Sequence, residues 1–162
     1  MRYSQNLLQK VYNNAQLKLQ LKRWQLLGKT TVFTNGVFDI LHEGHIKILS
    51  EAATYADILI VGVNSDASVK RLKGDARPVN TETSRALILS ALFMVDAVIL
   101  FEEDTPLELI QFIKPNVLVK GGDYTLDTIV GAKEVMANNG EVKIIPLAEG
   151  FSTTGIINKM KK

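Results

Sequence analysis

Hydrophobic positions follow two alternating patterns along most of the chain. Short apolar, β-branched runs occupy residues 31–34, 58–63, 97–101, 117–119 and 142–145. Apolar residues at helical spacing fill most of the segments between them, at His45–Tyr55, Glu82–Val95, Thr105–Ile113 and Thr128–Asn138. Near-continuous apolar strands that alternate with helices are typical of a parallel sheet covered on both faces. The pattern therefore predicts a doubly wound α/β fold with a five-stranded parallel sheet.

A further helical pattern precedes the first of these runs. Apolar residues recur at helical spacing between Leu7 and Leu27, and Gly28 follows as a plausible stop. The length of 162 residues fits a single domain. We expect residues 1–28 to form a leading helix that packs on the domain or on a second subunit, and residues 29–162 to form the domain itself.

Composition excludes several classes of function. Hydrophobic residues make up 46% of the chain, the formal charge is only +2, and Lys and Arg are spread along the sequence, which disfavours nucleic acid as the main partner. The absence of cysteine rules out disulfides, thiolate nucleophiles and cysteine-based metal sites. Without a secretory segment or an apolar run of membrane-spanning length, we expect a cytoplasmic protein with no membrane partner.

Polar and glycine-rich segments follow four of the five predicted strands. They comprise residues 35–45, 64–66, 120–124 and 148–154. In a Rossmann-like doubly wound sheet, ligands bind beyond the carboxyl ends of the strands. The chemistry is therefore expected at this edge of the sheet.

The only two histidines of the chain stand three positions apart in the first of these segments. His42 and His45 flank Gly44 where the first strand turns into its helix. Two imidazoles one helical turn apart, beside free N–H groups at a helix start, suit a phosphate group. Zinc would need further ligands, and no metal site is predicted; two purely structural histidines are the other alternative. Gly28-Lys29-Thr30 resembles the end of a P-loop but precedes a strand, so it is rejected.

The segment from Thr34 through Asp39 into His42-Glu43-Gly44-His45 resembles the signature of the cytidylyltransferase-like nucleotidyltransferases, and residues 151–157 resemble their second motif. Within that superfamily the chain is similar to D-glycero-β-D-manno-heptose 1-phosphate adenylyltransferases. The segments that carry this likeness are residues 63–80, 101–106 and 119–124.

The resemblance implies a set of site residues. His42, His45, Lys73 and Arg85 are expected to be catalytic by contacting phosphates. Residues expected to bind the nucleotide are Thr34, Asn35, Gly36, Phe38, Asp39, Gly44, Lys120, Gly121, Gly122, Asp123, Ser152, Thr153 and Thr154.

Several of these residues also have a structural interpretation. Asp39 and Asp123 can orient a ribose, a sugar hydroxyl or a metal-bound water, and each can equally cap a turn. Ser152 can bind phosphate or serve as an N-cap. Many superfamily members have an arginine shortly after the second motif, where this chain has Asn158 and Lys159.

The implied reaction is transfer of AMP from ATP to the heptose 1-phosphate with release of pyrophosphate, with Mg²⁺ held chiefly by substrate oxygens. The resemblance also implies a homodimer and a sugar kinase step on a separate chain.

Three alternatives remain beside this prediction. A glycerol-phosphate-type cytidylyltransferase using CTP would share both motifs. A tRNA synthetase fragment is suggested by the histidine motif and the terminal lysines, but it fails on size. A nucleotide-sensing module would be expected to have a damaged phosphate-binding set, and none is evident.

Overall fold

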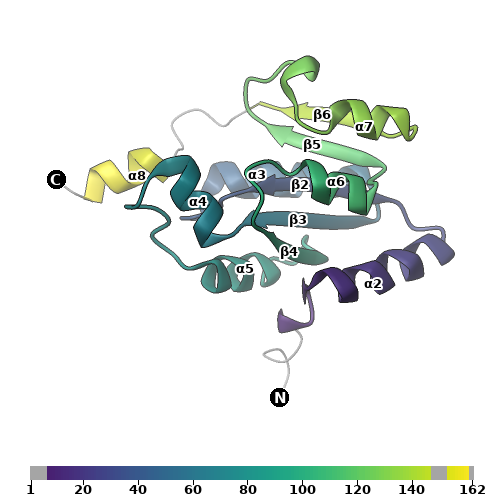
Figure 1. Ribbon diagram of the computed structural model, residues 1–162, viewed down its shortest axis with the longest axis horizontal. Helices are drawn as coiled ribbons and strands as arrows, with labels where there is room; N and C mark the ends of the chain where they lie inside the picture. Colours follow the sequence, from purple (N-terminus) through teal and green to yellow (C-terminus); the bar gives the residue numbers. More distant parts are fainter. Residues whose placement is uncertain (1–6, 147–152, 161–162) are drawn as a thin grey trace.

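The computed structural model of the chain describes residues 7–146 and 153–160 (Figure 1). Its strands are β1 (Val11–Tyr12), β2 (Thr31–Gly36), β3 (Ile58–Asn64), β4 (Ala97–Phe101), β5 (Val117–Gly121) and β6 (Glu141–Ile145). Its α-helices are α2 (Asn14–Leu26), α3 (Glu43–Ala52), α4 (Asp66–Lys73), α5 (Glu82–Ser90), α6 (Leu107–Ile113), α7 (Ala132–Ala137) and α8 (Thr153–Met160). Short 3₁₀ turns cover Ala53–Tyr55 and Leu126–Thr128.

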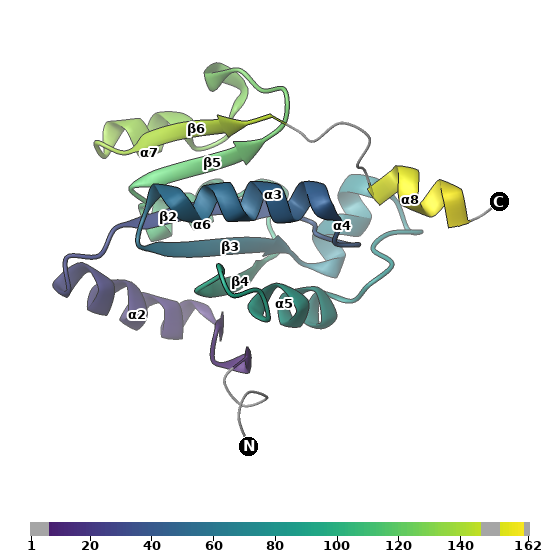
Figure 2. The ribbon, with the colours of Figure 1, turned by 180° about the vertical axis from the view of Figure 1, so that it is seen from behind.

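All pairings between the described strands are parallel, in the order β1-β4-β3-β2-β5-β6. The chain moves outward from β2 in one direction through β3 and β4, and in the other through β5 and β6. This reversal confirms the predicted doubly wound α/β class. The carboxyl ends of the strands face the end of the molecule that holds α4 and α8 (Figures 1 and 2).

Two hydrophobic clusters cover the two faces of the sheet. One joins α3 and α5 to the sheet through Leu49 and Leu89. The other joins α2, α6 and α7 to the opposite face and contains Trp24, Ile110 and Val135. The face covered by α3 and α5 is the nearer one in Figure 2. Burial on both faces explains why the central strands read as continuous apolar runs rather than as alternating ones.

The sheet contains six strands in the described residues, so the prediction of five was wrong. The additional strand is β1, whose residues were expected to belong to the leading helix. Val11 and Tyr12 pair instead with Val98 and Ile99 of β4. Asn13 then starts α2 through a capping box with Gln16, which ends the extended segment.

The shortened helix α2 packs on its own sheet. Leu17 is completely buried, and Trp24 is 8% exposed and contacts Tyr12 edge-on with ring centroids 6.5 Å apart. The stop at Gly28 was predicted correctly, since this residue adopts φ 67° just after the helix. No helix within residues 7–146 and 153–160 combines the length and apolar character needed to cross a membrane.

The segment after β3 contains a helix that is absent from the predicted pattern. Residues 66–73 form helix α4, which begins at Ser65 because its side chain accepts a hydrogen bond from the backbone N–H of Ser68. The helix ends at Gly74, whose φ of 88° disfavours any side chain. Lys73 therefore lies on the last turn of a helix.

Candidate active site

The turn from β2 into α3 brings the histidine motif to the carboxyl edge of the sheet. Phe38 adopts φ 49°, which reverses the chain direction just after the strand. Its buried ring packs against Gly36, where an added Cβ would lie 3.1 Å from the ring. The same ring meets His45 edge-on, with centroids 5.2 Å apart. Gly36 and Phe38 thus shape the turn that presents the histidines.

His42 and His45 form a stacked pair at the start of α3. Their ring centroids are 3.8 Å apart and their planes differ by 21°. His42 is the N-cap residue but its side chain does not cap the helix, so the first N–H groups of α3 gain no hydrogen bond from it. The ring of His45 keeps its Nδ1 buried and unpaired among the described residues.

Burial keeps both imidazoles neutral near pH 7. Desolvation lowers the pKa of His42, and desolvation with the charges of His42 and Lys73 lowers the pKa of His45 to about 4. Two charged rings could not stack at this distance without strong repulsion, whereas two neutral rings can. Each neutral ring has one N–H to donate to an anion.

A cleft of about 350 Å³ opens beside this motif at the carboxyl ends of β2, β3 and β5. Its walls include Asn35, Gly36, Asn64, Leu72, Lys73, Pro106, Lys120, Tyr124 and Ile129. The histidines are not part of these walls, but Lys73 lies close enough to His45 to affect its pKa. The structure therefore places the histidine pair next to the cleft through Lys73.

Lys120, near the end of β5, provides a second cation in the lining of the cleft. Its Nζ donates a 3.2 Å hydrogen bond to Oδ1 of Asn35 and lies 5.7 Å from the ring centre of Tyr124. Burial lowers the pKa of Lys120, because the charged form loses solvation. A partly desolvated ammonium held by a side-chain amide suits a phosphate or another anion inside the cleft.

Asp39 is held by hydrogen bonds from the segment that follows α4. Its side chain is fully buried and accepts hydrogen bonds from Arg77 Nε and from the backbone N–H groups of Val79 and Asn80. Burial by itself raises the pKa of this carboxyl, but these donors outweigh burial and the pKa is lowered. Asp39 anchors the loop that follows α4, which agrees with its alternative interpretation as a turn residue.

Arg85 is buried rather than directed at the cleft. Its side chain is 0% exposed and donates to the carbonyls of Asn80 and Val37 and to Oδ1 of Asp66. The three acceptors use all three nitrogens of the guanidinium. Arg85 therefore joins the β2–α3 turn to the loop before α5.

Thr34 and Gly121 also occupy structural positions. Thr34 is 2% exposed within β2 and is not part of the cleft wall. A Cβ on Gly121 would lie 2.3 Å from the side chain of Ile48, so this glycine lets α3 pack on β5. Gly122 follows with φ 133° and donates its N–H to the carbonyl of Ile145. The structure thus supplies a packing reason for Gly121 beside the expected approach of a nucleotide.

The remaining expected residues are distributed around this edge. Gly44 is buried in the first turn of α3, and Asp123 is exposed in the segment after β5. Thr153 and Thr154 open α8, with Asn158 and Lys159 further along it, whereas Ser152 lies outside the described residues. Helix α8 lies beside α4 in both views (Figures 1 and 2). The second motif therefore reaches the same end of the molecule as the cleft.

Sequence reasoning missed Arg77 and Asp66. Each faces a residue that had been assigned to substrate, since Arg77 pairs with Asp39 and Asp66 pairs with Arg85. The partners in these two ion pairs lie nearly 40 and 20 positions apart in the sequence, so no local pattern indicated that they would pair.

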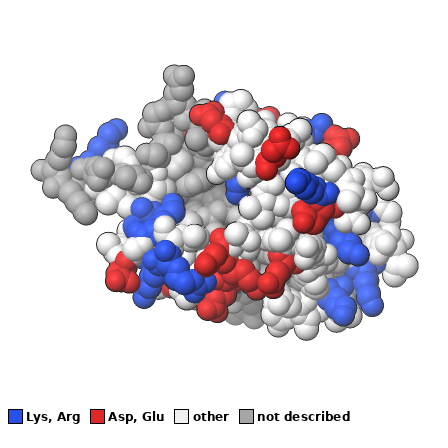
Figure 3. Space-filling view, turned by 45° about the horizontal axis from the view of Figure 1, so that its top comes forward, with Lys and Arg blue, Asp and Glu red and all other residues white. Residues whose placement is uncertain are grey.

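Exposed charges surround this region as well, where Figure 3 shows Lys and Arg beside Asp and Glu at the end that holds α4. Arg71, for example, pairs with Asp104 at 2.8 Å.

Comparison with known proteins agrees with this geometry. The family model described as Cytidylyltransferase-like matches residues 33–159. The chain is 54% identical over 150 residues to the protein named Bifunctional protein HldE of Rhodopseudomonas palustris (strain HaA2), covering 93% of this chain and 31% of that protein. The chain thus spans less than a third of the length of this relative.

Two solved structures are similar in fold. The lipopolysaccharide core biosynthesis protein from Thermoplasma volcanium GSS1 superposes with a TM-score of 0.60 and 33% identity, covering 75% of this chain and 98% of that chain. Pantoate-beta-alanine ligase from Francisella tularensis superposes with a TM-score of 0.63 at 16% identity, covering 93% and 76% of the two chains. The second likeness concerns the fold alone.

Proposed function

Because this chain belongs to the cytidylyltransferase-like family, we propose that it transfers AMP from ATP to D-glycero-β-D-manno-heptose 1-phosphate, forming ADP-heptose and pyrophosphate. The names of its relatives support the choice of substrate. One is called Bifunctional protein HldE, and one solved structure is described as a lipopolysaccharide core biosynthesis protein. The product would serve lipopolysaccharide core or related heptose-glycan synthesis.

The observation that carries the proposal is the stacked histidine pair at a helix start, together with a cleft that is lined by Lys73 and Lys120. An oxygen of the sugar phosphate forms the new bond to the α-phosphorus of ATP. The bond from that phosphorus to the bridging oxygen breaks, and pyrophosphate leaves. A sugar phosphate is already ionised near pH 7, so the enzyme needs to hold and neutralise anions rather than remove a proton.

In the proposed reaction, neutral hydrogen-bond donors and cations among the described residues have separate roles. His42 and His45 donate N–H groups to oxygens of the triphosphate as negative charge moves toward the leaving group. Lys73 and Lys120 line the cleft and reduce the repulsion between the two anionic substrates. Thr153 and Thr154 open α8, where helix N–H groups favour a phosphate.

Mg²⁺ fits this arrangement as an ion carried by the nucleotide. Within residues 7–146 and 153–160, no three His, Cys, Asp or Glu side chains are grouped to hold a metal. The ion would therefore rely mainly on phosphate oxygens and water, as Mg²⁺ commonly does. When bound, it would neutralise charge on the phosphates.

The test is a pyrophosphate-release assay on the purified chain. ATP and CTP are each offered with heptose 1-phosphate and with glycerol 3-phosphate, and the nucleotide-sugar product is identified by mass spectrometry. We expect release only with ATP and the heptose phosphate. Release with CTP and glycerol phosphate would instead establish the cytidylyltransferase alternative, and binding of ATP without release would indicate a sensing module.

Two further expectations belong to the same proposal. The chain is expected to form a homodimer and to act in the cytoplasm. Sedimentation of the purified chain measures the first, and fractionation of source cells tests the second.

A further inference from the structure

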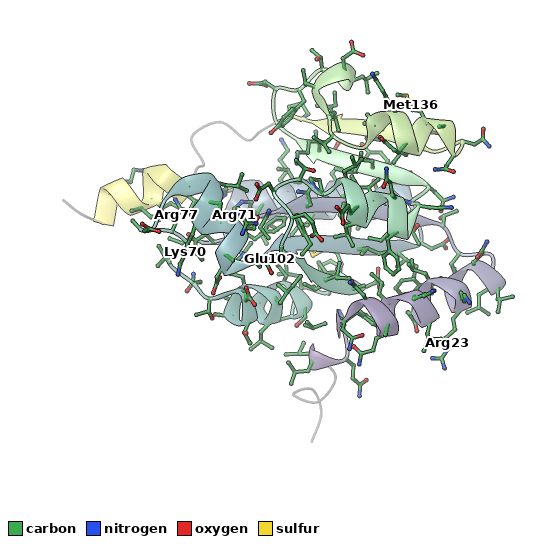
Figure 4. All side chains as sticks on the ribbon, in the orientation of Figure 1. Arg23, Lys70, Arg71, Arg77, Glu102 and Met136 are labelled. Carbon is green, nitrogen blue, oxygen red and sulfur yellow. The ribbon has the colours of Figure 1, made fainter. Side chains whose placement is uncertain are left out.

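Arg77 occupies the loop that follows α4, at the end of the molecule shared with α8 (Figure 4). Its side chain is only 13% exposed, and its Nε donates a 2.6 Å hydrogen bond to Oδ2 of Asp39. The terminal nitrogen Nη2 is buried and has no hydrogen-bond partner among the described residues. A buried donor of a charged group that lacks an acceptor is costly, so such a group needs an explanation.

The way Asp39 is shared explains why Nη2 remains open. A guanidinium and a carboxylate frequently pair through two parallel hydrogen bonds. Here Oδ1 of Asp39 instead accepts the backbone N–H groups of Val79 and Asn80, both at 2.9 Å. The side chain of Arg77 is thereby fixed to Asp39 through Nε, and its Nη2 is left without an acceptor.

The surroundings of this fork are positively charged. Lys73 lies four residues before Arg77, and burial together with the charge of Arg77 lowers the pKa of Lys73, partly offset by Asp39. Lys73 also lines the cleft and lies close enough to His45 to lower its pKa. The chain thus places two cations next to each other beside the histidine pair, and Asp39 is already occupied by hydrogen bonds. An anion with several oxygens would satisfy both cations.

We propose that Arg77 binds a phosphate oxygen of a substrate through Nη2, and that Asp39 is the positioning residue that holds Arg77 for this contact. The inference rests on the proposed nucleotidyl transfer, which brings two phosphate-bearing substrates to this edge. The phosphate belongs either to ATP or to the sugar phosphate. The planar fork of arginine suits two oxygens of one phosphate better than a lysine ammonium does.

The experiment compares Arg77→Gln with two matched losses of positive charge. Lys70→Gln removes an exposed cation from the neighbouring helix α4, and Arg23→Gln removes one from the distant α2. We expect Arg77→Gln to raise the KM for one substrate by at least about tenfold, whereas both control variants retain the parental KM values. A higher KM for ATP assigns the contact to the nucleotide, and a higher KM for heptose 1-phosphate assigns it to the acceptor.

Chemical rescue separates binding from a merely structural role. Adding guanidinium ion at millimolar concentration to Arg77→Ala should restore part of the lost activity, and it should not stimulate Lys70→Gln. Thermal unfolding of each variant verifies that the fold is kept. Parental KM values in Arg77→Gln, or a loss shared equally by Lys70→Gln, would overturn the proposal.

Calorimetric titration with pyrophosphate and with inorganic phosphate keeps this inference separate from the proposed function. Both titrations work without a sugar substrate, so a chain that makes no ADP-heptose can still show weaker phosphate binding after Arg77→Gln. Unchanged affinity for both anions would count against the Arg77 contact even in an active adenylyltransferase.

Asp39→Asn tests the positioning role. It keeps an acceptor but removes the charge, and it should raise the same KM as Arg77→Gln. The double variant should lose no more than Arg77→Gln alone, because both changes remove one interaction. Fully additive losses would show that Asp39 acts independently of Arg77.

Discussion

Two hollows lie at opposite ends of the strands, and both are bordered by lysines. The cleft at the carboxyl ends has a volume of about 350 Å³, whereas a groove between α2 and α6 at the amino ends has about 560 Å³. Lysines 18, 22, 29 and 114 border the groove. If size or charge alone identified a site, the groove would be the better candidate.

The cleft and the groove differ in the burial of their lysines and in the partners that fix these lysines. Lys120 in the cleft is partly buried, bonded to Asn35 and shifted in pKa, and the histidine pair is fixed by Phe38. In the groove Lys29 pairs with Asp57, and all four lysines are exposed. Charges that are desolvated and oriented before a ligand arrives bind a developing charge strongly, whereas solvated lysines do not. Preorganisation therefore favours the cleft over the groove as the proposed site.

The largest expected effect concerns the histidine pair. His42→Ala or His45→Ala should lower the turnover number by roughly 10²–10³, as the loss of one oxyanion donor does. The measurement is pyrophosphate release at saturating substrates. Lys47→Ala, an exposed change on the same helix, should keep the parental rate. Near-parental turnover in both histidine variants would end the assignment.

A variant of Arg85 tests whether its buried hydrogen bonds stabilise the fold near the cleft. Arg85→Met leaves Asp66 and two carbonyls without their donor and should reduce the free energy of unfolding by roughly 3–5 kcal/mol. The exposed pair of Arg71 offers a control, because Arg71→Met should cost less than about 1 kcal/mol. Urea unfolding measures both. Equal losses would mean that burial makes no difference between these two arginines.

A variant of Lys120 tests whether the ammonium group in the cleft contributes to binding of ATP. Lys120→Met keeps the apolar stem and removes the ammonium, so the Kd for ATP should rise about tenfold. Titration calorimetry measures this change, and unfolding should be little affected because the variant loses only the contacts with Asn35 and with the ring of Tyr124. An unchanged Kd would remove Lys120 from the nucleotide site.

The pH dependence of stability reports the burial of His45. Its pKa is about 4 in the folded chain, against an ordinary value of 6.5. Between these values the unfolded chain binds more protons, so the free energy of unfolding should fall as the pH decreases from 6.5 to 4, by up to about 1 kcal/mol per pH unit. His45→Asn should flatten this slope. A parental slope in that variant would show that other groups cause it.

The smallest effect on turnover and ATP affinity is expected from substitutions in the groove. Lys22→Gln and Lys114→Gln should change turnover and ATP affinity by less than about twofold, because exposed charges at the far end of the sheet contribute little. The same calorimetry and pyrophosphate assay apply. A tenfold loss in either variant would reverse the comparison between the two hollows.

The sequence by itself determined the sheet class and the edge of the sheet at which the motif residues collect. Apolar runs must be buried on both faces, and polar residues after those runs must collect at one edge, so the edge that carries His42 and Lys120 could be predicted. The motif residues also carried the family resemblance, because those signals are local. The two-residue strand β1 was missed, since Val11 and Tyr12 fit a helical pattern and are extended only because β4 offers a free edge.

Tertiary structure decided which charged residues line the cleft and which are held in buried ion pairs. Asp39 and Arg85 look like ligands in the sequence, but their partners, Arg77 and Asp66, lie far along the chain and come together only on folding. The stacking of His42 on His45 likewise depends on a turn shaped by Phe38. Whether a side chain is buried, and which residue it pairs with, depends on how the whole chain packs. A local sequence pattern therefore predicts neither property.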